Sequence, residues 1–215
     1  MKVVDSFDPR RVKCVVFDFG FTLSSDFYFK IAPPNIPKWH EIIQGHIFKD
    51  PAITVPWMKG EIGSRDVAAV IARYIPLDIE TILSTMETGC KELAFNPAVW
   101  LFALEQKLTG RKIALVTDNM DVFTRVVVPA HKLERIFDVI INSADVHEIR
   151  KDILWPLAFE RLDNGIDYGN SLLVEDGETE PALFRQLGGY AYQYTNDKAF
   201  SKWVKSIDWT MNPYA

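Results

Sequence analysis

Polar residues able to do chemistry stand at the ends of four short apolar segments in this sequence. They are Asp18 after segment 12–17, Thr117 at the end of 113–117, Lys151 after 139–142, and Glu175 and Asp176 at the end of 171–175. Carboxylates in such a set can hold Mg²⁺, which prefers oxygen ligands and keeps several waters, so two or three of them suffice. A single acid after a strand is usually a turn or cap residue, but one polar group at each segment end is not expected by accident.

The elements that must position these residues are short strands and the helices between them. Runs of four to six apolar residues suit strands buried on both faces. The expected strands are 12–17, 113–117, 139–142, 171–175 and 190–194, and the helical patterns between them are 122–133, 153–162 and 180–187. A further helix is expected to begin at Asn96-Pro97 and to end before Gly110. This alternation predicts a parallel sheet, whose ligands bind beyond the carboxyl ends of its strands.

The long gap after the first strand predicts an inserted helical lobe. Roughly 90 residues separate the first two strands, too many for a loop within one compact layer. Helical patterns cover 39–48, 64–74 and 78–93, with Ser64 and Asp78 as N-cap candidates. The aromatic residues of this stretch (Phe27, Tyr28, Phe29, Trp39 and Trp57) are expected to form the lobe's own core, although one or two of them could line a substrate pocket.

These segments together resemble the haloacid dehalogenase (HAD) superfamily. Four segments carry the resemblance: residues 15–23 (VVFDFGFTL), 115–119 (LVTDN), 150–152 (RKD) and 173–180 (LVEDGETE). Their order along the chain matches the four motifs of that superfamily, and the gap falls where it carries a helical cap. The resemblance implies an α/β fold with a Rossmann-like parallel sheet, formed by residues 1–23 and 94–215. Residues 24–93 would form an inserted, all-helical cap domain, with hinges near 24–26 and 92–96.

The resemblance also implies a role for each motif residue. Asp18 would be the nucleophile that forms an aspartyl-phosphate, Thr117 and Lys151 would be catalytic, and Asp118 and Asn119 would join these two in substrate binding. Mg²⁺ would be held by Asp18, by Glu175 and Asp176, and by the backbone carbonyl of Gly20.

Four positions depart from the superfamily's pattern, and one of them is Asp152, which follows Lys151 where the superfamily usually has Pro. Gly20 stands where its phosphatases carry a second Asp that protonates the leaving group and later activates water. Asp26, Asp118 or a cap residue could replace that acid, or the substrate could have a good leaving group, or turnover could be weak or lost. Phe21 replaces a small residue; its ring could narrow the mouth of the site, but we expect it to pack under the cap. Glu180 replaces an Asp or Asn and lies either near the metal or on the surface.

The expected function is therefore that of a Mg²⁺-dependent phosphatase acting on a small phosphorylated metabolite. A hydrolase of carbon–halogen bonds is the related alternative, because it uses the same nucleophile without a metal. The intact acidic pair and the absence of a Tyr at position 20 speak against it. The third alternative is a binding or regulatory protein that kept the fold and lost turnover.

Composition excludes other classes of function. The net charge is −5 and no run of Lys or Arg occurs, so a nucleic acid or an anionic membrane is not the expected partner. No apolar stretch of 18 residues is present, and charged residues interrupt the N-terminus before a signal peptide could form. Cys14 and Cys90 are isolated, which favours a reducing compartment. We expect a cytoplasmic monomer or homodimer.

Overall fold

The core of the molecule is a five-stranded parallel sheet, seen in a computed structural model that describes residues 7–162 and 165–209. Its strands are β1 (Cys14–Phe17), β2 (Lys112–Thr117), β3 (Val139–Asn142), β4 (Ser171–Glu175) and β5 (Tyr190–Gln193), in the order β3-β2-β1-β4-β5. All five predicted strands and the α/β fold class are thereby confirmed, with ends that shift by one or two residues. The first strand along the chain lies at the centre, so polar residues after β1 have neighbours on both sides.

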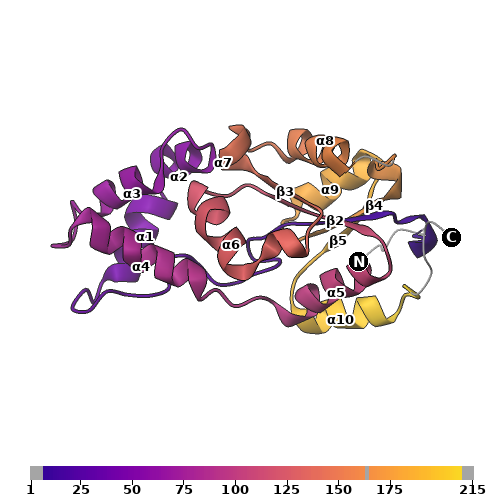
Figure 1. The fold of residues 1–215 in the computed structure, drawn as a ribbon, viewed down its shortest axis with the longest axis horizontal. Helices are drawn as coiled ribbons and strands as arrows, with labels where there is room; N and C mark the ends of the chain where they lie inside the picture. The colour runs from indigo at the N-terminus through magenta and orange to yellow at the C-terminus, as the bar shows by residue number, and fades with distance from the viewer. Residues whose placement is uncertain (1–6, 163–164, 210–215) are drawn as a thin grey trace.

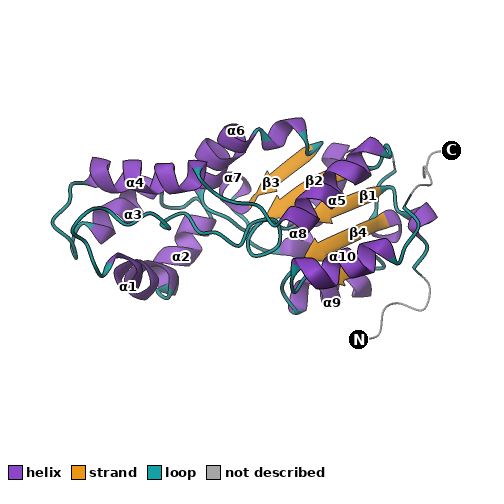
Figure 2. Ribbon diagram, turned by 90° about the horizontal axis from the view of Figure 1, so that it is seen from below, coloured by secondary structure: helices purple, strands orange, loops and turns teal. Residues whose placement is uncertain are grey.

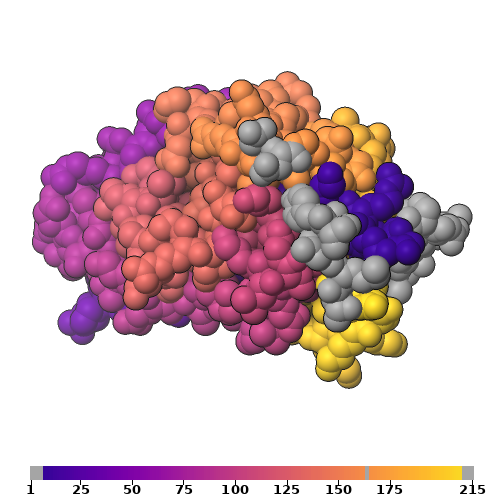
Figure 3. Space-filling model, turned by 45° about the vertical axis from the view of Figure 1, so that its right-hand side comes forward, coloured from indigo at the N-terminus to yellow at the C-terminus, as the bar shows by residue number. Residues whose placement is uncertain are grey.

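Helices cover both faces of this sheet. The helices α5 (Pro97–Leu108) and α10 (Asp197–Lys205) contact each other on one face, where Phe102 meets Phe17 of β1. Figure 3 shows α10 in yellow beside α5 on the surface. The opposite face is covered by α8 (Lys151–Leu162) and α9 (Thr179–Gln186), whose Trp155 and Phe184 belong to a second apolar cluster. Each strand therefore contributes apolar side chains to both faces, which explains the uninterrupted apolar runs.

The segment between β1 and α5 contains the predicted helical insert. Its helices are α1 (Trp39–Ile43), which continues as a π-helical turn over Gln44–Phe48, α2 (Pro51–Met58), α3 (Ser64–Ile71) and α4 (Ile79–Lys91). They lie together at the end of the molecule away from the strands (Figures 1 and 2). The domain boundaries at residues 24 and 93 remain a prediction.

Two of the predicted helix starts can be compared with the structure. Asp78 is the N-cap of α4, and its carboxylate accepts a hydrogen bond from the Thr81 backbone N–H at 2.9 Å. Ser64 is the first residue inside α3 and the N-cap is Gly63, so this prediction is wrong by one residue. The Ser64 hydroxyl instead donates to the carboxylate of Asp121, at the start of the helical connection after β2, at 2.6 Å.

The insert packs tightly on the sheet-containing part of the chain. Inside the insert, Phe29 contacts both Trp39 and Trp57. All three belong to the same apolar cluster as Phe17 and Phe102. Gly60, with φ of 64°, comes so close to the carbonyl oxygen of Ala144, in the short helix α7 (Ser143–Val146), that a Cβ would collide with it. This contact requires glycine on steric grounds as well as for its backbone conformation.

The connection from β2 to β3 is made of short helical pieces. It contains a π-helical turn (Phe123–Val127), α6 (Val128–His131) and a 3₁₀ turn (Leu133–Arg135), where one helix over 122–133 was predicted. Two further 3₁₀ turns, Pro9–Arg11 and Tyr168–Asn170, precede β1 and β4. Among the described residues, no helix has the length and apolar character needed to cross a membrane.

Candidate functional site

The structure brings the polar residues at the strand ends together on one edge of the sheet. Asp18 follows the central strand β1, and Glu175 and Asp176 lie at the end of β4 beside it. These three carboxylates each offer an oxygen atom, and the three atoms lie within 4.8 Å of one another. Asp18 and Glu175 are 5% exposed, so both carboxylates are held away from bulk water.

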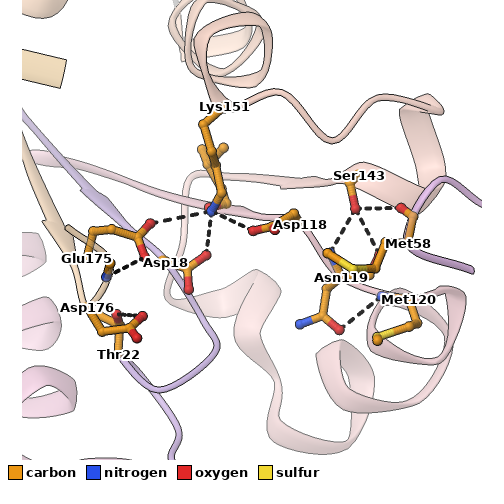
Figure 4. A network of polar contacts seen from close by, with 12 residues as sticks. Asp18, Thr22, Met58, Asp118, Asn119, Met120, Ser143, Lys151, Glu175 and Asp176 are labelled. Atoms are coloured by element: carbon orange, nitrogen blue, oxygen red, sulfur yellow. Dashed lines mark hydrogen bonds and ion pairs between the residues drawn. The ribbon is translucent and has the colours of Figure 1, made fainter. Parts of the chain in front are cut away.

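Lys151 is the cation at the centre of this cluster. It is the first residue of α8, and its side chain reaches back under the strand ends. Its ammonium group lies 2.6 Å from Asp18 Oδ1, 3.1 Å from Asp118 Oδ1 and 3.5 Å from Glu175 Oε2 (Figure 4). Burial alone lowers the pKa of Lys151, but the three carboxylates outweigh burial and hold it well above its usual value. The lysine therefore stays charged at neutral pH.

The carboxylates outnumber the positive charge that faces them. Burial is the main reason that the pKa of Asp18 rises to about 6, and repulsion from Asp118 and Asp176 adds to it, although Lys151 opposes the rise. Burial and then repulsion from Asp18 raise the pKa of Glu175 to about 9. A set of oxygen donors with excess negative charge is what a hard divalent cation requires, so these residues fit Mg²⁺.

The loop after Asp18 shapes the rim of the cluster. Thr22 Oγ1 donates to Asp176 Oδ1 at 3.2 Å, and the Thr22 backbone N–H donates to the Gly20 carbonyl at 2.6 Å. The Gly20 carbonyl, predicted as a metal ligand, therefore already accepts one hydrogen bond and keeps one lone pair. The Glu180 carboxylate lies over Gly177, so that a Cβ added to Gly177 would collide with it. That added Cβ would also lie 3.8 Å from Glu175 Oε1. Glu180 thus sits at the edge of the cluster.

Phe21 does not pack under the helical insert, so this prediction is wrong. Its side chain is 67% exposed, because the residue adopts a left-handed backbone conformation, with φ of 53°, in the tight turn that holds Thr22. Its N–H donates to the Ser24 carbonyl at 2.8 Å, which fixes the turn. The ring instead borders an open hollow of about 590 Å³ that also reaches Asp176 and residues 194–197.

Besides Lys151, three residues at the end of β2 and just after it were predicted to bind substrate. Thr117 is 1% exposed, and no hydrogen bond joins its hydroxyl to another described residue. The Asp118 side chain is 40% exposed at the rim and contacts Lys151. Asn119 is 7% exposed; its backbone N–H donates to Ser143 Oγ at 2.8 Å. Ser143, the first residue of α7, was not identified from the sequence.

Two residues join the insert to this loop and were also missed as site residues. Tyr28, predicted as part of the insert's core, donates its hydroxyl to Asn119 Oδ1 at 2.6 Å. Asp121 accepts hydrogen bonds from Trp57 Nε1 at 2.7 Å and from the Ser64 hydroxyl. These hydrogen bonds join residues that are far apart in the sequence: Tyr28 and Asn119 by 91 residues, and Asp121 from Trp57 and Ser64 by 64 and 57 residues. No local sequence pattern could therefore reveal them.

Asp26 does not contribute to the cluster. Its carboxylate accepts a hydrogen bond from Lys30 Nζ at 2.6 Å and another from the Ala94 backbone N–H at 2.9 Å. These contacts join the two segments that connect the insert to the sheet. Asp26 therefore has a structural position at this junction, which weakens the hypothesis that it replaces the acid missing at Gly20.

Comparison with known proteins identifies the fold. No family model matches the sequence, and no curated protein is significantly similar to it. A HAD-family enzyme from Bacteroides thetaiotaomicron superposes with a TM-score of 0.67 at 15% identity, covering 90% of this chain and 98% of its own. The same enzyme in complex with magnesium and inorganic phosphate gives a TM-score of 0.60 at 14% identity, covering 86% of this chain and 94% of that one.

A second similar structure is that of an enzyme named for a different reaction. The L-2-haloacid dehalogenase from Xanthobacter autotrophicus superposes with a TM-score of 0.61 at 17% identity, covering 91% of this chain and 83% of its own. At these identities the similarity establishes that the chain has the HAD-like fold, and it leaves the reaction to be argued from the site.

Proposed function

We propose that this protein is a hydrolase of small phosphate esters or acyl phosphates, with Asp18 as covalent nucleophile and Mg²⁺ as cofactor. The observation that carries the proposal is the buried cluster in which Lys151 contacts Asp18 while Glu175 and Asp176 lie within metal-binding distance of it. The B. thetaiotaomicron enzyme with the same fold binds magnesium and phosphate, which supports the proposal.

The reaction begins with attack of the Asp18 carboxylate on phosphorus. A P–O bond forms to Asp18, the bond to the leaving oxygen breaks, and its electron pair stays on that oxygen. Like charges ~4 Å apart repel by roughly 4 kcal/mol at an effective dielectric of 20, so a carboxylate needs positive charge in order to approach a phosphate dianion. Lys151 supplies part of that charge through its contact with Asp18. Bound Mg²⁺ would supply the rest, as a Lewis acid toward the phosphoryl oxygens.

Water then hydrolyses the aspartyl-phosphate. The attacking water forms a bond to phosphorus, the acyl–phosphate bond breaks, and inorganic phosphate leaves as Asp18 regains its carboxylate. Thr117, which is buried at the end of β2 beside β1, would donate its hydroxyl to a phosphoryl oxygen. No acid stands at position 20, so leaving groups that depart without protonation are favoured, such as those of acyl phosphates or sugar 1-phosphates.

Hydrolysis of p-nitrophenyl phosphate and acetyl phosphate, with Mg²⁺ and with EDTA, tests the proposal. We expect metal-dependent turnover that Asp18→Asn abolishes without unfolding the protein. Asp26→Asn is the matched control, because that carboxylate lies outside the cluster, and it should retain activity. Turnover that survives in Asp18→Asn would show that the nucleophile is assigned wrongly.

Halide displacement by Asp18 is the second candidate, favoured by the likeness to a haloacid dehalogenase. It would not need the acidic pair Glu175-Asp176, whose position within 4.8 Å of an Asp18 oxygen therefore favours the phosphatase. Chloride release from 2-chloropropionate in the presence of EDTA would reverse this order. Absence of turnover on all three substrates would instead favour a binding protein without catalysis.

A further inference from the structure

The Asn119 side chain is held in one orientation by two donors. Its Oδ1 accepts one hydrogen bond from the Tyr28 hydroxyl at 2.6 Å and another from the Met120 backbone N–H at 2.9 Å. A carbonyl oxygen has two lone pairs, so both are used, and rotating the amide by 180° would place its N–H groups against two donors. The amide nitrogen must therefore point the other way. In Figure 4 it lies on the side of the Asp18 carboxylate, with the oxygen on the side of Met120.

That nitrogen is a donor without a partner in the described part of the chain. No hydrogen bond from Asn119 Nδ2 to another described residue is present, although the side chain is 7% exposed. The backbone around it is fixed as well, because the Asn119 N–H donates to Ser143 Oγ and Asn142 Nδ2 donates to the Met120 carbonyl at 3.0 Å. The residue is largely buried, but this nitrogen is not among the fully buried polar atoms that lack a partner, so it is accessible from the candidate active site. A donor that is fixed in orientation, open to the site and without a partner among the described residues is free to bind an acceptor on the ligand.

The direction of the proposed reaction identifies that acceptor. Attacking and leaving oxygens lie roughly in line through phosphorus, so the leaving group departs on the side away from Asp18. Asp18 ends the central strand, and the helical insert lies beyond the strand ends (Figures 1 and 2). Asn119 contacts Tyr28 of the segment leading into the insert and thus stands at the junction, on the leaving-group side.

We propose that Asn119 Nδ2 donates a hydrogen bond to the leaving oxygen and that Tyr28 is the positioning residue that orients it. This inference rests on the proposed function and explains how a site with Gly20 in place of an acid can stabilise negative charge on the departing oxygen. No proton is transferred by Asn119; the leaving oxygen keeps the electron pair of the broken P–O bond and takes its proton from water. Burial, with the nearby groups Cys90 and Asp18 adding to it, holds the pKa of Tyr28 well above its usual value, so its hydroxyl stays a donor.

The test is the dependence of kcat/KM on leaving-group basicity, from 2,4-dinitrophenyl phosphate to phenyl phosphate. This quantity reports transition-state stabilisation up to the departure of the leaving group. Tyr28→Phe should lower it by about threefold to tenfold for phenyl phosphate, the range typical of one neutral hydrogen bond, and by less than about twofold for the dinitrophenyl ester. Asn119→Ala should steepen the dependence further.

Two comparisons separate positioning from a structural role. In the Asn119→Ala background, Tyr28→Phe should have no further effect, because Tyr28 acts through Asn119. Trp39→Phe, which removes a different buried hydrogen bond of the insert (Nε1 to the Phe29 carbonyl, 2.9 Å), should leave the slope unchanged.

Three outcomes would overturn the inference. An equal loss of kcat/KM for every ester would show that Tyr28 and Asn119 act only on structure. A full effect of Tyr28→Phe in the Asn119→Ala background would show that the two residues act separately. Absence of Asp18-dependent turnover for every ester would overturn the proposed function and this inference with it.

Discussion

Replacing Lys151 with Met tests the electrostatic reading of the cluster most directly. The ammonium group lies 2.6 to 3.5 Å from three carboxylates, those of Asp18, Asp118 and Glu175. At an effective dielectric of 20, each contact with an ionised carboxylate is an attraction of roughly 5–6 kcal/mol before desolvation is subtracted. The contact with Glu175 adds to this only to the extent that Glu175 is ionised, since its pKa is about 9. Removing one partner of a buried ion pair typically costs ~3–5 kcal/mol, because the other partner stays buried without compensation. We expect a loss of that size for Lys151→Met.

This loss should depend on pH. Without the lysine, the carboxylates relieve their repulsion by taking up protons, which costs little at low pH and more as the pH rises. The free energy of unfolding, measured by urea denaturation in EDTA, should therefore fall more at pH 8.5 than at pH 6 when Lys151 is replaced.

The neighbouring Arg150 provides the matched control. Its side chain is 63% exposed and forms an ion pair with Asp152 at 2.7 Å, so Arg150→Met should cost less than ~1 kcal/mol at both pH values. The reasoning is refuted if Lys151→Met costs no more than Arg150→Met, or if its cost is larger at pH 6 than at pH 8.5.

Three further predictions concern the same region. Gly20→Asp fits sterically, since its Cβ would meet only Asp18 Oδ2, at 3.9 Å. The new carboxyl should supply a general acid and raise the turnover of alkyl phosphates by at least about tenfold, and unchanged steady-state rates would contradict this. The pKa values of Asp18 (about 6) and Glu175 (about 9) are raised in the folded state, so the metal-free folded protein binds more protons than the unfolded chain between about pH 4 and 9 and loses stability as pH rises through that window. In EDTA, the melting temperature of Glu175→Gln should therefore rise relative to that of the wild type as the pH increases. A difference in melting temperature that does not change with pH would contradict the raised pKa of Glu175. Asp121→Ala should cost about 1–3 kcal/mol in urea unfolding, because Trp57 Nε1 and the Ser64 hydroxyl lose their acceptor; a cost below that of a surface Asp→Ala change would show that this link is unimportant.

The sheet could be predicted because its strands are buried on both faces. Val15 and Phe17 of β1 face one apolar cluster while Cys14 and Val16 face the other, so no polar residue interrupts the run. Three of the described helices were missed. Helix α7 has only four residues, and helix α2 contains Pro51 and Pro56. Helix α10 did offer readable signals, because it is amphipathic and the side chain of its N-cap Asn196 accepts a hydrogen bond from the Ala199 N–H at 2.9 Å.

Of the candidate site, only the residues at the ends of the strands could be predicted. Asp18 and Glu175 follow adjacent strands, so topology alone places them side by side. The orientation of the Asn119 side chain depends instead on Tyr28, which lies 91 residues away in the segment leading into the insert. The position of the Phe21 side chain depends on a left-handed backbone turn. Neither follows from a motif, because a motif fixes residue types and leaves tertiary hydrogen bonds open.

The energetics of the cluster argue for a bound ligand more strongly than the motifs do. Folding buries Asp18 and Glu175 almost completely and leaves the pKa of Glu175 near 9, so the free protein is less stable than it would be with uncharged side chains at these positions. Lys151 compensates only one charge of the set. A cation that binds the folded protein, and an anion that binds beside Lys151, would recover this free energy by mass action. The combination of an anion and a divalent cation is what a phosphate ester with Mg²⁺ provides, whereas a haloalkanoate provides the anion alone. Stabilisation of the metal-free protein by Mg²⁺, and further stabilisation by inorganic phosphate only when Mg²⁺ is present, would therefore distinguish the two chemistries even before a substrate is found.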